Sequence, residues 1–258
     1  MDEILGRLRD LFDARLVQER PRIVVKARDA QDVLRLIRFA AEHSLHVMVL
    51  GTGSSCPEQL PIPKNVIALI MSDYTEPMEL DLENLTLTAG AGVRVAALSQ
   101  QLQSGGWEYR FLPDTHRATL GGAVAGFGTH ASSPPYQSLR DFLLGLKAAY
   151  SEGYLLQWGG KMVKDVAGLN MSSLLLGSRG ALGVILEVTL RLVPYPSPIY
   201  DSDRFDPASL PENSPAASPS DAYRREIQQA LDPHGIFYQL QYNQTFPDGA
   251  QTDAVRRK

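Results

Sequence analysis

Three glycine-rich segments carry the residue types in this chain that best suit ligand chemistry. The first is Gly51-Thr52-Gly53-Ser54-Ser55, which directly follows an apolar stretch with the pattern of a strand. Glycine lets the backbone turn with positive φ and approach a ligand closely, while Ser and Thr add hydroxyl donors. This combination suits a pyrophosphate, although a plain tight turn explains the segment equally well. It lacks the Lys of a Walker loop and the spacing of a Rossmann fingerprint.

The other two segments are residues 118–129, rich in Gly, Ala and Thr, and residues 177–185, a glycine loop that leads into a long apolar pattern. An interior glycine costs a helix about 1 kcal/mol relative to alanine, so residues 118–129 are hard to explain as a core helix. Backbone packed closely against a flat or phosphorylated ligand explains them better. Together, the three segments favour an extended dinucleotide.

The residues that could do catalysis define no site. The chain has five histidines, all scattered, and one cysteine. His116 could face a flat ligand or be a solvent-exposed imidazole, and Cys56 could be a reactive or an inert buried thiol. Lys161 and Lys164 could steer an anion or belong to a solvated, salt-bridged face. We find no convincing set of base and arginines, so the catalytic residues are unknown, and no metal site is expected.

Apolar periodicity predicts the elements that must position these segments. Residues 3–18 repeat apolar side chains at steps of three and four, which predicts a helix that packs on its own domain or docks a partner. Asp29 is the expected cap of a second helix. Strands are predicted over 23–25, 46–50, 66–70, 85–89, two runs within 141–158, and 183–193, and helices over 94–104 and 223–231. The expected fold class is α+β.

Composition excludes several classes of protein. The chain has 258 residues, of which 44% are hydrophobic and 21% charged, and its net charge is -4. A negative net charge argues against nucleic-acid binding, and no apolar run reaches the roughly 20 residues of a membrane span. The N-terminus shows no signal peptide. One cysteine excludes an intrachain disulfide framework and an all-cysteine iron–sulfur site. We therefore expect a soluble, cytoplasmic protein, peripheral to a membrane only through partners.

The order of several motifs resembles the PCMH-type FAD-binding domain of the vanillyl-alcohol oxidase superfamily, in the branch of glycolate oxidase FAD subunits and D-lactate dehydrogenases. The resemblance covers residues 20–196. The motifs that carry it are residues 84–93 (NLTLTAGAGV), 118–122 (ATLGG), 138–145 (SLRDFLLG), 159–168 (GGKMVKDVAG) and 177–183 (GSRGALG).

The resemblance implies two α/β subdomains that hold FAD between them, non-covalently, largely through backbone groups. A covalent link through His130, as in some relatives, is the alternative. The implied FAD contacts are Gly51, Thr52, Gly53, Ser54, Ser55, Pro113, Asp114, Thr115, Thr119, Leu120, Gly121, Gly122, Gly126, Gly128, Thr129, Ser138, Gly180, Gly183, Val184 and Ile185.

The resemblance also implies a division of the chain. Residues 1–19 are expected to be an N-terminal helix, and residues 20–196 the FAD-binding domain. Residues 197–222, rich in Pro and Ser, read as a linker in place of the family's substrate cap domain. Residues 223–242 are expected to form a C-terminal helix and turn, and residues 243–258 a flexible tail.

The implied function is the FAD-binding subunit of a glycolate or D-lactate oxidising complex, not catalytically competent alone. Its implied partners are an iron–sulfur subunit that exchanges electrons with the flavin and a larger FAD-containing paralogous subunit. The small 2-hydroxy acid would bind at the level of the complex. Departures from the family pattern include Thr52, Gln137, Asn170 and Ser173. They favour an alternative, a structural or assembly subunit with weakened or lost FAD binding.

Overall fold

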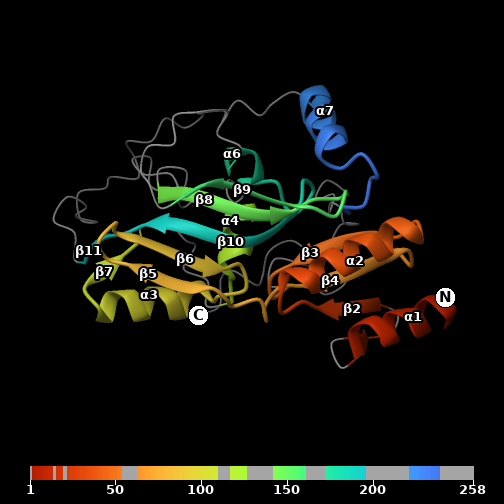
Figure 1. Cartoon of the computed structure of the whole chain (residues 1–258), viewed down its shortest axis with the longest axis horizontal. Coiled ribbons are helices and arrows are strands. Elements are labelled where there is room, and N and C mark those ends of the chain that lie inside the picture. The colour runs from red at the N-terminus through yellow and green to blue at the C-terminus, as the bar shows by residue number, and fades with distance from the viewer. Residues whose placement is uncertain are drawn as a thin grey trace, which may run out of the picture.

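In the computed structural model, the described residues form two larger β-sheets with covering helices and a short two-stranded ribbon (Figure 1). The structure describes residues 2–13, 16–19, 22–53, 63–109, 117–126, 142–160, 172–195 and 221–238. In Figure 1 the first sheet, in red and orange, lies at the right with α1 and α2, and the second sheet, from yellow to cyan, lies at the left with α3.

The first sheet has four strands in the order β1-β2-β4-β3, and β2, β4 and β3 run parallel. Its strands are β1 (Leu16–Glu19), β2 (Arg22–Lys26), β3 (His46–Leu50) and β4 (Val66–Ile70). The helix α2 (Ala30–Glu42) connects β2 to β3, and the Asp29 side chain accepts a hydrogen bond from the Asp32 N–H at its start, as predicted. The α2 face that carries Val33, Leu36 and Ile37 is fully buried in the core over this sheet.

The helix α1 (Asp2–Phe12) was expected either to pack on its own domain or to dock a partner. Its Leu8 and Phe12 side chains are fully buried in the same core. The N-terminal helix therefore packs on its own domain. It is shorter than the predicted 3–18, since Asp13 takes a positive φ of 45° that ends the helix, and residues 16–19 form β1 instead. β1 pairs antiparallel with β2, so the chain after α1 continues directly into the first sheet.

The second sheet is antiparallel, with five strands in the order β5-β6-β10-β8-β9. They are β5 (Met78–Asp81), β6 (Thr86–Gly90), β8 (Leu143–Ala149), β9 (Leu155–Gly159) and β10 (Val184–Arg191). The helices are α3 (Val95–Ser104), α4 (Leu120–Gly126) and α6 (Ser172–Leu175), and a two-stranded ribbon joins β7 (Trp107–Glu108) to β11 (Val193–Pro194).

The central strand β10 separates its side chains by face, as its alternation predicts. Val188 and Leu190 are fully buried in the second core, whereas Glu187 on the other face makes a 2.6 Å ion pair with Lys147 of β8. On that same polar face, the hydroxyls of Thr189 and Thr88 lie 2.9 Å apart and are hydrogen-bonded. Val184 and Leu186, nearer the start of β10, belong to the core of the first sheet.

The helix α7 (Asp221–Leu231) is followed by a turn that returns the chain to the first sheet. Phe237 forms a parallel bridge with Val47 of β3. We call residues Leu231–Tyr238 the C-terminal clasp. The predicted division at 196, 222 and 242 falls largely on residues outside those that the structure describes, so it stays a prediction.

Candidate functional site

Parts of all three glycine-rich segments meet where the two sheets join. The link is Thr119, which is 2% exposed and lies against Gly51 at the end of β3. A Cβ atom at Gly51 would overlap the Thr119 Oγ1, so this approach requires glycine. The same Oγ1 accepts a hydrogen bond of 3.2 Å from the Gly122 N–H and caps the start of α4.

The second segment is helical at residues 120–126, which corrects our expectation that it would not be a core helix. Two features offset the low helix propensity of its glycines: the Thr119 cap, and a close contact with the turn after β6. The Gly121 N–H donates to the Ala91 carbonyl over 2.8 Å, and a Cβ at Gly121 would lie 2.6 Å from the Ala91 Cβ. Small residues at both positions let the backbones touch.

The third segment closes on the other two. The Arg179 N–H donates to the Ala125 carbonyl over 2.9 Å, and the Gly177 N–H donates to the Val124 carbonyl over 3.1 Å. Gly180 takes a positive φ of 77° and lies against Val49 of β3, whose Cβ would be 3.2 Å from an added Cβ. Residues 177–183 therefore contact both α4 and the first sheet.

Of the predicted contact residues, the structure describes twelve: Gly51, Thr52, Gly53, Thr119, Leu120, Gly121, Gly122, Gly126, Gly180, Gly183, Val184 and Ile185. The contacts given above bring Gly51, Thr119, Gly121, Gly122 and Gly180 to this junction. The side chains of Leu120, Val184 and Ile185 are core residues, so only their backbones could reach a ligand. Ser54, Ser55, Pro113, Asp114, Thr115, Gly128, Thr129 and Ser138 lie outside the described residues, as do His116, His130, Cys56, Lys161 and Lys164.

Thr52 has a different role from the one its hydroxyl suggested. The Thr52 Oγ1 donates to the Arg117 carbonyl over 2.7 Å, and the same carbonyl accepts from Arg94 Nη1 over 3.2 Å. The Thr52 proton is therefore committed within the chain, and the hydroxyl holds the first glycine loop against the second segment. Sequence reasoning missed Arg94 and Arg117. The only available signal was their place beside the GAG and ATLGG motifs.

The Thr52 hydrogen bond gives a direct prediction. Thr52→Val keeps the side-chain volume but removes the donor, so the first glycine loop should lose its tie to Arg117. A neutral hydrogen bond contributes about 1 kcal/mol, so we expect FAD affinity to fall about fivefold. Titration of the chain with FAD, followed by flavin fluorescence, measures the change. Thr52→Ser keeps the donor and should bind as wild type, and equal losses in both variants would contradict the role of the hydroxyl.

Two buried tyrosines near the junction have raised pKa values. Burial, with smaller contributions from the Glu187 and Asp29 charges, raises the pKa of Tyr74 to about 12. Burial also raises the pKa of Tyr109 to about 12, partly offset by its hydrogen bond with Ser99. The Tyr109 hydroxyl donates to the Val95 carbonyl over 2.8 Å, so it accepts from Ser99.

These pKa values predict a loss of stability in alkali. The unfolded chain loses its tyrosine protons near the ordinary pKa of 10, whereas the folded chain keeps them until about pH 12. The stabilisation is therefore complete below pH 10 and is lost as the pH rises from 10 to 12. Urea unfolding at stepped pH should show this fall. Tyr109→Phe should make the fall shallower, and an unchanged slope would contradict the assignment.

Three histidines lie within the described residues: His43, His46 and His234. Within the described part of the chain, no group of three or more His, Cys, Asp or Glu side chains could hold a metal ion. His43 and His46 are used structurally, since His46 Nδ1 donates to the Gly235 carbonyl over 2.8 Å. His234 is exposed on the C-terminal clasp.

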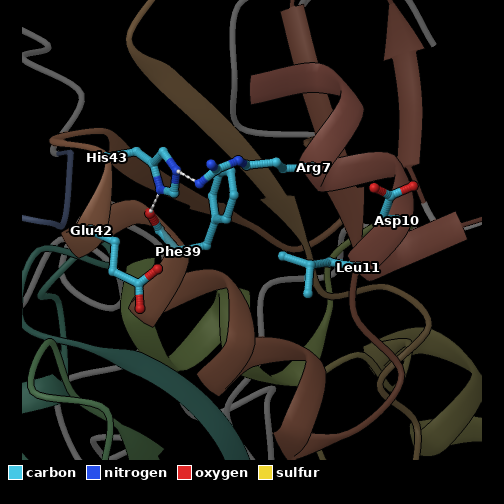
Figure 2. Close-up of a pocket in the computed structure, with 6 residues that line it drawn as sticks. All are labelled: Arg7, Asp10, Leu11, Phe39, Glu42 and His43. Atoms are coloured by element: carbon cyan, nitrogen blue, oxygen red, sulfur yellow. Dashed lines mark hydrogen bonds between the residues drawn. The ribbon is translucent and has the colours of Figure 1, made fainter. Parts of the chain in front are cut away.

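A surface hollow between α1 and α2 is distinct from the glycine junction. Figure 2 shows Arg7 of α1 reaching His43 at the end of α2, with Nη1 and Nε2 3.2 Å apart. Because guanidinium groups only donate and carbonyls only accept, His43 Nε2 accepts from Arg7 and Nδ1–H donates to the Phe39 carbonyl over 2.9 Å. The His43 ring also stacks on Phe39, with 4.1 Å between the ring centroids. Its polar atoms serve helix packing.

Comparison with known proteins identifies the family. The family model described as FAD binding domain matches residues 21–159, so the chain belongs to the PCMH-type FAD-binding family, whose members include flavin-dependent oxidoreductases. FAD is its cofactor.

Named relatives lie within the same family. Glycolate oxidase subunit GlcD of Bacillus subtilis is 30% identical over 198 residues, which cover 76% of this chain and 42% of GlcD. D-lactate dehydrogenase of Archaeoglobus fulgidus is 31% identical over 172 residues, which cover 67% of this chain and 39% of that enzyme. Glycolate oxidase subunit GlcE of Escherichia coli is 35% identical over 169 residues, which cover 65% of this chain and 48% of GlcE. The chain thus spans less than half the length of each of these relatives.

A solved structure of alkyldihydroxyacetonephosphate synthase superposes with a TM-score of 0.63 and 20% sequence identity, over 75% of this chain and 40% of that one. At this identity the likeness shows the fold alone. It agrees with the predicted α+β fold of two subdomains.

The residues at the junction fit a dinucleotide. Within the described residues, the backbone N–H groups of Thr52 and Gly53 meet no backbone acceptor, and backbone N–H groups are the donors that bind phosphate oxygens in such loops. Space also exists, because a Cβ at Gly53 would meet nothing within 4 Å. Arg94 and Arg117 are exposed beside these groups and supply positive charge in a chain of net charge -4.

Proposed function

We propose that this chain is the FAD-binding subunit of a complex that oxidises a small 2-hydroxy acid such as glycolate or D-lactate. The observation that carries the proposal is the meeting of the three glycine-rich segments at the junction of the sheets. Support comes from similarity to glycolate oxidase subunits GlcD and GlcE and to D-lactate dehydrogenase.

Within the proposal, each element has a defined task. Residues 51–53 and the backbone around Thr119 and Gly122 hold the pyrophosphate, non-covalently, and Gly180 and Gly183 shape the neighbouring wall. Bound FAD supplies the ability to accept and pass on electrons. An iron–sulfur partner subunit exchanges electrons with it, because one cysteine cannot hold a cluster in this chain. A larger FAD-containing paralogous subunit binds and oxidises the hydroxy acid.

Spectroscopy of the purified chain tests the cofactor part of the proposal. The chain should show the visible flavin absorption bands after incubation with FAD and removal of excess. Anaerobic addition of glycolate or D-lactate should leave these bands unbleached until the partner subunits are added. Bleaching of the isolated chain would contradict the proposed division of labour. Co-purification from the native source, with iron and acid-labile sulfide assays on the captured proteins, tests for the iron–sulfur partner.

A second candidate is a structural or assembly subunit that has weakened or lost FAD binding. The observation that favours it is the Thr52 hydroxyl, which donates to the Arg117 carbonyl instead of pointing a free donor at the junction. In that case the chain stays colourless after incubation with FAD and removal of the excess, yet the partner subunits still co-purify with it. The same absorption experiment therefore separates the two candidates.

A further inference from the structure

The C-terminal clasp (Leu231–Tyr238) contacts both sheets. On the first sheet, the Val47 N–H donates to the Ile236 carbonyl over 2.7 Å, and the Tyr238 N–H donates to the Val47 carbonyl over 2.8 Å. Ile236 and Phe237 are 1% and 3% exposed in the first core. At its other end, the Leu231 side chain packs against the core of the second sheet, and the Leu231 carbonyl accepts from the Ser151 hydroxyl over 3.2 Å.

Asp232 gives the clasp its shape. Its carboxylate is buried, and Oδ1 accepts from the Ile236 N–H while Oδ2 accepts from the Phe237 N–H, each over 2.8 Å. The Gly235 N–H closes the same turn onto the Asp232 carbonyl over 3.0 Å. Loss of this carboxylate would leave two buried N–H groups without acceptors, which destabilises the docked turn. The clasp therefore stays docked only while Asp232 holds the turn.

Both elements that the clasp holds also carry the glycine junction. β3, which pairs with Phe237 near its start, runs on to Gly51 at its end. The turn that carries Ser151 follows Ala149 and Tyr150, and these two residues contact Gly183, where an added Cβ would lie 2.9 Å from the Ala149 carbonyl oxygen. The clasp thus holds one wall of the junction on each sheet.

We propose that docking of the clasp and binding of FAD stabilise each other, an inference that rests on the proposed function. A ligand that touches residues 51–53 on one side and residues 119–122 and 183 on the other fixes the relative position of the sheets. The clasp favours the same position, because it bonds to both. Two binding events that favour one arrangement are positively coupled, and the coupling acts equally in both directions.

Hydrogen exchange on the whole chain tests whether FAD binding stabilises the docked clasp. Saturating FAD should slow exchange at the Val47, Ile236, Phe237 and Tyr238 amides, which are the donors of the clasp. FAD binding with unchanged exchange at these amides overturns the coupling but leaves the proposed function intact. A chain that binds no FAD at all overturns both.

The reverse direction is tested with Asp232→Ala and its matched control His234→Ala, an exposed position in the same turn. Coupling free energies between sites commonly correspond to factors of about 5 to 150, so we expect FAD to leave Asp232→Ala about tenfold faster than wild type. His234→Ala should release FAD at the wild-type rate. Fast clasp exchange in Asp232→Ala with an unchanged release rate overturns the proposal. Should Asp232→Ala not fold, the exchange experiment on the wild-type chain decides alone.

Discussion

Gly51→Ala is expected to remove tight FAD binding while the chain still folds. The new methyl group would overlap the Thr119 Oγ1, which is fixed by its bond to the Gly122 N–H. The first glycine loop must then move away from the second segment, and the two would no longer present one surface. Overpacking of this kind costs about 1–3 kcal/mol, so FAD affinity should fall about 5- to 150-fold. Fluorescence titration with FAD measures this loss.

A second substitution isolates the cause of the loss. In Gly51→Ala/Thr119→Ala, the Oγ1 and Cγ2 atoms are gone and the nearest remaining atom, the Cβ of residue 119, is 3.3 Å from the new methyl group. The double variant should therefore bind FAD better than Gly51→Ala alone. Gly51→Ala/Thr119→Ser keeps the hydroxyl and should show no such recovery. Equal recovery in both double variants would mean that the hydroxyl overlap is not the cause.

Gly92→Ala should cause a large loss of stability. Gly92 follows β6, and its N–H donates to the Tyr74 carbonyl over 2.7 Å. An added Cβ would overlap the Met71 carbonyl oxygen and lie 2.8 Å from the Tyr74 carbonyl oxygen. Both atoms belong to the backbone, so no side-chain rotation relieves the clash. We expect a loss of about 3 kcal/mol, at the upper end for overpacking, and a fall in Tm of about 6–12 °C.

Gly6→Ala is the matched control for that measurement. Gly6 lies within α1, and a Cβ there would meet nothing within 4 Å. Alanine is the better helix former by about 1 kcal/mol, so this variant should melt slightly above wild type. Thermal unfolding followed by circular dichroism compares the two substitutions. Similar Tm values for Gly92→Ala and Gly6→Ala would show that the backbone around Gly92 can shift to make room for the methyl group.

The sequence predicted the elements whose apolar pattern is strong. The strands β3 and β4 and the helix α3 match their expected ranges closely, and α2 begins after the predicted Asp29 cap. The edge strand β5 was missed. Its residues Met78, Glu79 and Leu80 are all exposed, so no burial pattern marks it. The end of α1 was misplaced because the apolar spacing continues through Leu16 into β1.

The site was predictable only in part. Glycine runs indicate where the backbone must lie close to another segment. In the structure, Gly51 lies against Thr119 and Gly121 lies against Ala91. The direction of a hydroxyl proton depends on a partner that is distant in sequence. Thr52 therefore read as a ligand donor, although it donates to Arg117, 65 residues later. The helix α4 was missed because its packing partner Ala91 is distant in the sequence.

The position of β10 has a consequence for how the chain folds during synthesis. β10 is the middle strand of the second sheet, yet it is made after β5, β6, β8 and β9. Until residue 191 leaves the ribosome, β6 and β8 each present an edge that only β10 can cover. Val184 and Leu186 of this strand also complete the first core. Both sheets should therefore become protease-resistant together and late, and unpaired edges are exposed to aggregation until then. A nascent chain stalled before residue 184 should need a chaperone, and one stalled well beyond residue 195 should not.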